Sequence, residues 1–172
     1  AKSVQEINRG VILRMIYERR LCSRSEIAQG SGLDASTVTR VVQQLVDDRI
    51  VEESILQKVE NQRGRRSIGL KMAADPHRVL VVRLQRLNFK VAMLDLTGSI
   101  LKSIEIPVNS VSTAENIFDQ IVESLNSFLG LCKENLVGIG ITLPGPFLED
   151  SERIVLITES PDWHQFDLIR RL

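Results

Sequence analysis

Apolar residues recur at helical spacing along the first third of the chain and predict three short helices. The first helix has the apolar positions Val4, Ile7, Val11, Met15 and Ile16. The second places Ile27 and Ala28 on its inner side. The third has Val38, Val41, Val42 and Leu45 at i, i+3, i+4 and i+7, the spacing of one buried face.

Polar residues mark where the second and third helices begin. Ser23 and Glu26 have the spacing of a capping box, in which each side chain bonds a free backbone amide. Asp34 is a favourable N-cap for the third helix. Gly30 and Gly32 are expected to form the turn between the two helices, because glycine tolerates a positive φ. This pattern predicts a helix-turn-helix.

A strand-like hairpin follows the helices. Residues 50–59 are rich in Val and Ile, and residues 67–72 resume the apolar alternation. The segment between them carries Arg63, Arg65 and Arg66 around Gly64. Three helices followed by a β-hairpin is the order of a winged helix-turn-helix, with the arginine-rich segment at the tip of the wing.

The polar residues of this region are typical of contacts with double-stranded DNA. Hydroxyl, amide and guanidinium groups bond phosphates and base edges, and the second helix of such a motif lies in the major groove. Arginines on a wing suit the negative potential of a narrow minor groove. The candidate DNA-binding residues are Ser25, Ser36, Thr37, Thr39, Arg40, Gln44, Arg63, Arg65 and Arg66.

Two alternatives remain open for these residues. Polar faces of amphipathic helices are commonly just solvated, and the same head could instead dock a protein partner. The charge distribution favours DNA. The chain is neutral overall, but residues 1–72 hold 13 Lys and Arg against 9 Asp and Glu, whereas the remainder holds 9 against 13. A basic head on an acidic body directs one end toward phosphate.

The second part of the chain has the pattern of an α/β domain. Strands are expected over residues 79–84, 90–96 and 100–108, and a capped amphipathic helix beginning near Ser112 and Glu115 follows them. Residues 136–143 are almost continuously apolar, as in a buried parallel strand. We therefore predict an α+β chain, with a winged-helix domain at residues 1–72, a linker at 73–78 and a second domain at 79–172.

Composition narrows the classes further. No apolar run approaches the roughly 20 residues of a membrane span, and no secretory leader is visible, which predicts a cytoplasmic protein without a membrane partner. Cys22 and Cys132 are far apart in sequence and do not indicate a disulfide framework. The chain has only two histidines, His77 and His164, and no metal-ligand spacing, so neither metal nor cofactor is expected.

The motifs together resemble the ROK family, which groups sugar-responsive repressors with sugar kinases. The resemblance rests on Ile27–Leu33, Ser36–Arg40 and Gly64–Arg66 in the head. In the second part it rests on Val91–Gly98, Gly138–Pro146, Pro161–Trp163 and Asp167–Leu168. It implies that residues 79–172 are the beginning of an actin-like, ribonuclease-H-like domain.

The sequence departs from the kinase members of that family at their phosphate-binding hairpin. Where those have Asp-x-Gly-Gly-Thr, this chain has Arg83, Gln85, Arg86 and Leu87 in place of the acid, the glycines and the threonine. Without glycine the backbone cannot approach a phosphate closely. The expectation is a regulator that is not an enzyme, with a sugar kinase carrying a DNA-binding head as the alternative.

The family's domain continues beyond the length of this chain, so we expect a partial regulator. The family's catalytic Asp, main sugar contacts and zinc motif would come later. Residues 144–146 and 159–163 would line the near side of a sugar cleft, although a Pro-Gly-Pro turn also simply ends a strand. The resulting prediction is a transcriptional regulator, a repressor of sugar-utilisation genes. It would bind operator DNA as a homodimer or tetramer in its intact form and respond to a sugar whose binding residues the sequence does not identify.

Overall fold

The computed structural model describes residues 3–55, 68–108, 113–144, 147–148, 153–154 and 171. The chain divides into two compact units, Ala1–His77 and Arg78–Leu172, which we call the head and the body. The segment from Ala73 to His77, within the predicted linker, is bonded to the head: Ala73 N donates to Ile50 O at 3.0 Å, and a ring nitrogen of His77 lies 2.8 Å from Asp48 O. The role of residues 73–78 as a linker stays a prediction.

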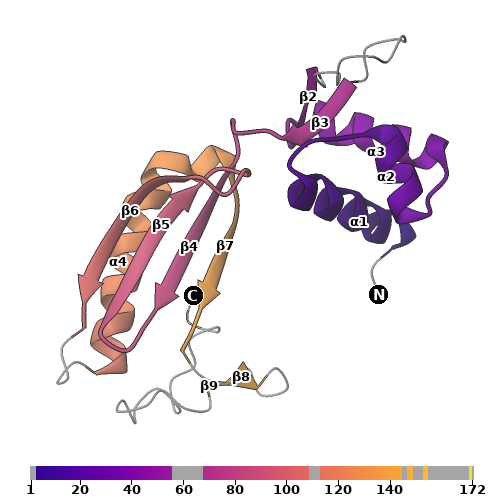
Figure 1. Ribbon diagram of the computed structural model, residues 1–172. Helices are drawn as coiled ribbons and strands as arrows, with labels where there is room; N and C mark the ends of the chain where they lie inside the picture. Colours follow the sequence, from indigo (N-terminus) through magenta and orange to yellow (C-terminus); the bar gives the residue numbers. More distant parts are fainter. Residues whose placement is uncertain are drawn as a thin grey trace. The chain divides into compact units, whose positions relative to one another are not determined.

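The head has three helices and a small antiparallel sheet (Figure 1). Its elements are α1 (Val4–Arg19), β1 (Cys22–Ser23), α2 (Arg24–Ser31), α3 (Ala35–Asp47), β2 (Val51–Ile55) and β3 (Ile68–Met72). The strands lie in the order β1–β3–β2, so the short β1 between the first two helices pairs with the second strand of the hairpin. The sequence pattern did not predict β1.

The predicted helix ends are confirmed, with one exception. Ser23 and Glu26 form a complete capping box, and the side chain of Asp34 accepts the amide of Thr37. Gly32 ends α2 in the left-handed conformation with φ 70°, which glycine adopts without steric cost. Gly30 was expected in the turn but lies inside α2, because a single left-handed residue is enough to end the helix.

The core of the head contains the predicted buried face of α3 but only part of the predicted face of α1. Val38, Val41, Val42 and Leu45 are all buried. On α1 the buried residues are Ile12 and Ile16, whereas Val4, Ile7 and Val11 are exposed, Ile7 by 53%. The predicted helix is confirmed, but the stripe of Val4, Ile7 and Val11 lies outside its buried side, which spacing alone did not show.

The body is a mixed sheet with one long helix on one face (Figure 1). Its elements are β4 (Arg78–Leu84), β5 (Asn88–Leu94), β6 (Ile100–Pro107), α4 (Ala114–Cys132), the 3-10 turn η1 (Lys133–Asn135), β7 (Leu136–Thr142), β8 (Phe147–Leu148) and β9 (Arg153–Ile154). The main sheet has the order β6–β5–β4–β7, with β7 parallel to β4. The predicted succession of three strands, a helix and a strand is present.

Two local predictions for the body need correction. The N-cap of α4 is Thr113, whose hydroxyl accepts the amide of Asn116, and Ser112 lies outside the described residues. The run at residues 136–143 forms the parallel strand β7, but the strand is not buried. In the described sheet β7 has a strand neighbour on one side only, and Val137 and Ile139 are 58% and 46% exposed. Apolar content does not tell an edge strand from a central one.

Within the described residues, no helix is both long enough and apolar enough to cross a membrane. Cys22 and Cys132 are buried free thiols, and burial raises the pKa of both. Among the described residues, no group of three or more His, Cys, Asp or Glu side chains is placed so that it could hold a metal ion.

Candidate nucleic-acid interface

Helix α3 presents a polar face to solvent because its opposite face is buried in the head. Ser36, Thr39, Arg40 and Gln43 are exposed on it, and Thr37 and Gln44 are half-buried. Within the described part of the chain, the guanidinium of Arg40 has no hydrogen-bonding or ionic partner, so its N–H donors are available to a ligand. The structure thus brings the predicted residues of α3 onto one helix, and α2 packs against that helix.

The first turn of α3 is organised by Asp34. Its carboxylate accepts the Thr37 amide at 2.8 Å, the Thr37 hydroxyl at 2.7 Å, and the Ser36 hydroxyl. The hydrogen bond from Ser36, followed by those from Thr37, holds the pKa of Asp34 well below its usual range. Sequence reasoning identified Asp34 only as a cap. The close spacing of Asp34, Ser36 and Thr37 in the sequence was the signal for the hydrogen bonds from the two hydroxyls to this carboxylate.

The remaining candidate on α2, Ser25, is exposed at the beginning of that helix. Its hydroxyl lies 2.9 Å from the hydroxyl of Ser23, which in turn donates to Glu26 at 2.7 Å. Those three side chains form a chain of hydrogen bonds around the N-terminus of α2. The Ser25 hydroxyl is therefore hydrogen-bonded within the first turn of the helix-turn-helix.

The hairpin expected to carry the wing is present as the paired strands β2 and β3. Ile55 lies opposite Ile68 at the last described pair. Arg63, Arg65 and Arg66, the predicted wing-tip residues, lie outside the described residues. Their role as minor-groove contacts stays a prediction.

Several acidic residues of the head are already paired. Asp48 accepts a hydrogen bond from Arg9 at 2.8 Å, Glu53 is paired with Arg24 at 2.7 Å, and Glu52 with Lys71 at 2.7 Å. Pairing neutralises these carboxylates locally, so they oppose an approaching phosphate less than free carboxylates would. The first two pairs also join α1 to the end of α3 and α2 to β2.

The hairpin that binds phosphate in the kinases is a tight turn in this chain. Gln85 N donates to Asn88 O at 2.8 Å, which closes the turn between β4 and β5. This amide is therefore used within the backbone. Arg83 and Leu87 have exposed side chains beside it. The geometry offers charge near the turn but not a backbone cradle.

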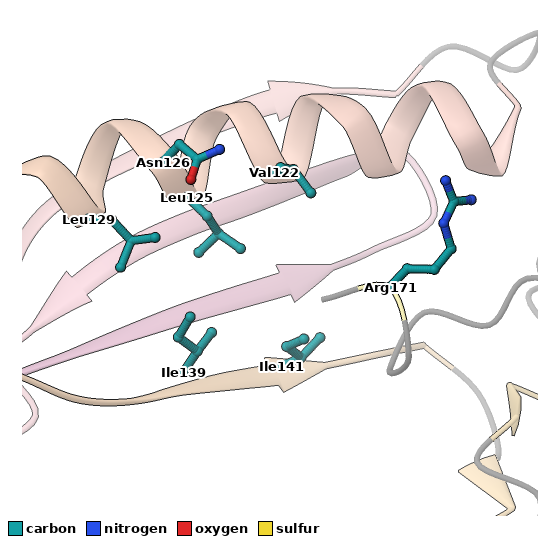
Figure 2. A pocket seen from close by; sticks show the side chains of 7 residues that line it. All are labelled: Val122, Leu125, Asn126, Leu129, Ile139, Ile141 and Arg171. Carbon is teal, nitrogen blue, oxygen red and sulfur yellow. The ribbon is translucent and has the colours of Figure 1, made fainter. Parts of the chain in front are cut away.

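A hollow lies in the body between α4 and β7 (Figure 2). It has a volume of about 320 Å³. Its lining is mainly apolar, with the guanidinium of Arg171 at one end, and comprises Val122, Leu125, Asn126, Leu129, Ile139, Ile141 and Arg171. Arg171 is paired with Glu115 and stacks over the Phe118 ring at 4.9 Å. Residues 145–146 and 159–163, expected near a sugar cleft, lie outside the described residues.

Comparisons with known proteins relate both units to bacterial regulators. The MarR family model matches residues 6–64, which covers most of α1, the helices α2 and α3, and the first strand of the hairpin, β2. The DNA-binding transcriptional dual regulator NagC of Escherichia coli is 26% identical over 88% of this chain and 37% of its own length. The xylose repressor of Bacillus subtilis is 23% identical over 96% of this chain and 42% of its own length. An uncharacterised protein of Sinorhizobium fredii, y4fQ, is 29% identical over 82% of the chain and 36% of its own length.

Among solved structures, a ROK family transcriptional regulator homologous to the Escherichia coli Mlc protein superposes with a TM-score of 0.68. The match covers 98% of this chain and 43% of the other, at 20% sequence identity, and therefore concerns the fold of both units. Over nearly all of its length the chain is therefore similar in fold to a ROK family regulator. The body accordingly has part of the actin-like fold of the ROK domain, and the head is a winged helix-turn-helix of the MarR type. The chain spans about two fifths of the length of these relatives.

Proposed function

We propose that this chain binds operator DNA through its head and forms part of a transcriptional repressor of sugar-utilisation genes. One observation carries the proposal: α3 buries one face in the helix-turn-helix and presents Ser36, Thr39, Arg40 and Gln43 on the other. A helix of this kind lies in the major groove with its N-terminal residues on the bases. The names of the N-acetylglucosamine repressor and xylose repressor relatives support regulation by a sugar.

Arg40 is the strongest candidate for direct contact because its guanidinium is unpaired in the described structure and exposed on α3. Arg40→Ala should lower the affinity for a selected operator by roughly 1–3 kcal/mol and relax its specificity at one position. Arg83→Ala removes the same charge from an exposed site of the body and is the matched control. Band-shift titrations measure both. Equal affinities for the parent and Arg40→Ala would contradict a role for α3 in recognition.

The wing is proposed to contact the neighbouring minor groove through Arg65, with Arg63 and Arg66 beside it. Arg65→Ala should weaken binding mainly where the flanks are A·T-rich, because a narrow minor groove has the strongest negative potential. Titration against duplexes that differ only in the flanks tests this. An equal loss on A·T-rich and G·C-rich flanks would assign Arg65 to general phosphate binding.

We also propose that the intact regulator binds as a dimer, or as a tetramer of two dimers, on a pseudo-palindromic site. One recognition helix covers only a few base pairs, so two half-sites are needed for useful specificity. Sugar binding to the ROK domains would alter the spacing of two heads, which is a coupling between two sites. Light scattering of the protein on DNA measures the stoichiometry. Saturation of an asymmetric site by one head would argue against this assembly.

The protein is proposed not to be an enzyme. The turn between β4 and β5 is closed by its own backbone, and Arg83, Gln85, Arg86 and Leu87 replace the acid, glycines and threonine of the kinase hairpin. The alternative, a ROK sugar kinase with a DNA-binding head, predicts tight binding of Mg-ATP. Calorimetry with Mg-ATP and a coupled assay over a panel of sugars separate the two. Micromolar ATP affinity, or turnover, would favour the kinase.

A further inference from the structure

The hydrogen bonds at the beginning of α3 fix which way the hydroxyl protons point. A serine or threonine hydroxyl has one proton and two lone pairs. The protons of Ser36 and Thr37 are both donated to the carboxylate of Asp34. The parts of these two hydroxyl groups that remain for a ligand are therefore lone pairs, which accept hydrogen bonds.

The arrangement persists at neutral pH because Asp34 remains ionised. The hydrogen bonds from Ser36 and Thr37 lower the pKa of this carboxyl group, so the charged form is the one present. A carboxylate only accepts hydrogen bonds. Neither hydroxyl can therefore turn its proton outward without leaving an Asp34 oxygen with one partner fewer.

The other candidate hydroxyls of the head have the same polarity. The Thr39 hydroxyl donates to Ala35 O at 2.7 Å. Ser23 gives its single proton to Glu26, so in the 2.9 Å contact between the two serines Ser25 must be the donor. The four candidate hydroxyls therefore all offer lone pairs to a ligand: those of Ser25, Ser36, Thr37 and Thr39. Arg40, which only donates, has the opposite polarity.

Phosphates and bases respond differently to such a surface. Phosphate oxygens only accept hydrogen bonds, so they have nothing to give the outward lone pairs of Ser36 and Thr37, and the Asp34 charge repels them. In the major groove the donors are the N6 amino group of adenine and the N4 amino group of cytosine. These two hydroxyls of the first turn of α3 are therefore suited to amino groups and unsuited to the phosphates of the DNA backbone.

We propose that Asp34 orients the Ser36 and Thr37 hydroxyls so that they recognise an adenine or cytosine amino group in the operator, while Arg40 recognises acceptor groups. Asp34 is in this view a positioning residue for specificity, in addition to capping α3. The inference rests on the proposed DNA binding of the head. It adds which chemical groups of the DNA the first turn of α3 recognises.

The test begins by selecting an operator from a random duplex library with the parent chain. Each adenine or cytosine of the half-site is then replaced, one at a time, by an analogue without its major-groove amino group: purine for adenine, 2-pyrimidinone for cytosine. At one base pair this change should lower affinity on the order of fivefold, the value of one ordinary hydrogen bond. At the same base pair, a 7-deaza purine, which lacks the N7 acceptor, should bind as the unmodified duplex does.

Variants assign the effect to the first turn of α3. In Thr37→Val and Ser36→Ala, removal of the amino group from the base should lower the affinity for the operator less than it does in the parent. The difference should be clearest in the double variant. Asp34→Asn keeps a cap oxygen but replaces one acceptor with an NH₂ group, so one hydroxyl turns its proton outward and the dependence on the amino group should fall. Asp47→Asn, which removes the same charge at the other end of α3, should keep the parent's dependence.

The outcomes separate this inference from the proposed function. If the parent selects no sequence and binds no duplex, the proposed function and the inference both fail. If it selects an operator but no amino-group removal weakens binding, or Asp34→Asn and Asp47→Asn behave alike, DNA binding stands and the inference is overturned. Circular dichroism confirms that each variant is folded, so that a loss of affinity is not a loss of structure.

Discussion

In the head every element contributes to the core, whereas in the body the core is concentrated in two strands and one helix. The buried apolar residues of the head come from α1, α2, α3 and all three strands. In the body they come from β4, β5 and α4, and β6 and β7 supply only partly buried side chains. The difference arises because the body sheet is covered by α4 on one face, so burial falls on its central strands.

Because of this contrast, an apolar residue in the sequence does not predict burial equally well in the two units. In α3, four apolar residues at helical spacing are all buried. In β7, four apolar residues follow one another closely, yet two are largely exposed, and in the described sheet β7 has a strand neighbour on one side only. The spacing in α3 indicated its buried face, whereas the apolar residues of β7 did not indicate the position of that strand in the sheet. The exposed side of β7 also borders the hollow beside α4 (Figure 2).

The largest expected effect is in the concentrated core of the body. Phe128 is buried on α4, so Phe128→Ala should lower the free energy of unfolding by roughly 3–5 kcal/mol. Leu131, on the same helix, is 60% exposed, and Leu131→Ala should change it by less than about 0.5 kcal/mol. Urea unfolding of the two variants measures the difference. Similar losses would mean that α4 buries a wider face than the structure shows.

A matched pair on α1 tests the corrected face of that helix in the head. Ile12 is fully buried and Ile7 is 53% exposed. Ile12→Ala should cost about 2–5 kcal/mol because it leaves a cavity, while Ile7→Ala should cost only a few tenths. Thermal unfolding followed by circular dichroism compares them. A large loss for Ile7→Ala would show that the stripe with Val4 and Val11 is covered in solution.

Helix caps provide a smaller comparison between the units. Ser23 is buried and takes part in a complete capping box, so Ser23→Ala should cost about 1 kcal/mol. Thr113 caps α4 through one exposed bond of 3.3 Å, and Thr113→Ala should cost roughly half of that. Unfolding in urea gives both values. A greater loss at Thr113 would mean that capping matters more to the long helix α4 than to the shorter helices of the head.

The smallest effect is expected from the ion pair between Arg24 and Glu53, which joins α2 to β2. Both side chains are partly exposed, so the coupling free energy from Arg24→Gln, Glu53→Gln and the double variant should be about 0.2–1 kcal/mol. It should shrink as salt is added, since salt screens exposed charges. A coupling that is unchanged in high salt would indicate a packing effect of the Arg24 side chain.

The helix-turn-helix could be predicted largely from the sequence because its determinants are local. Ser23, Glu26, Asp34 and Gly32 act within a few residues of their own positions, and the buried face of α3 follows from its spacing. The order of elements in the body could be predicted for the same reason. The candidate DNA-binding residues of the helix-turn-helix could also be named from the sequence, although their contact with DNA stays a prediction.

Only the tertiary structure decided which side of α1 packs inward, that β1 joins the hairpin, and that β7 has one strand neighbour in the described sheet. These depend on contacts between residues far apart in sequence, such as Cys22 with Leu70 and Arg78 with Leu136. The proton directions around Asp34 also required coordinates, because a short sequence spacing permits several hydrogen-bond patterns. Local chemistry determined where helices begin and end, and long-range packing determined which of their faces, and which strands, are covered.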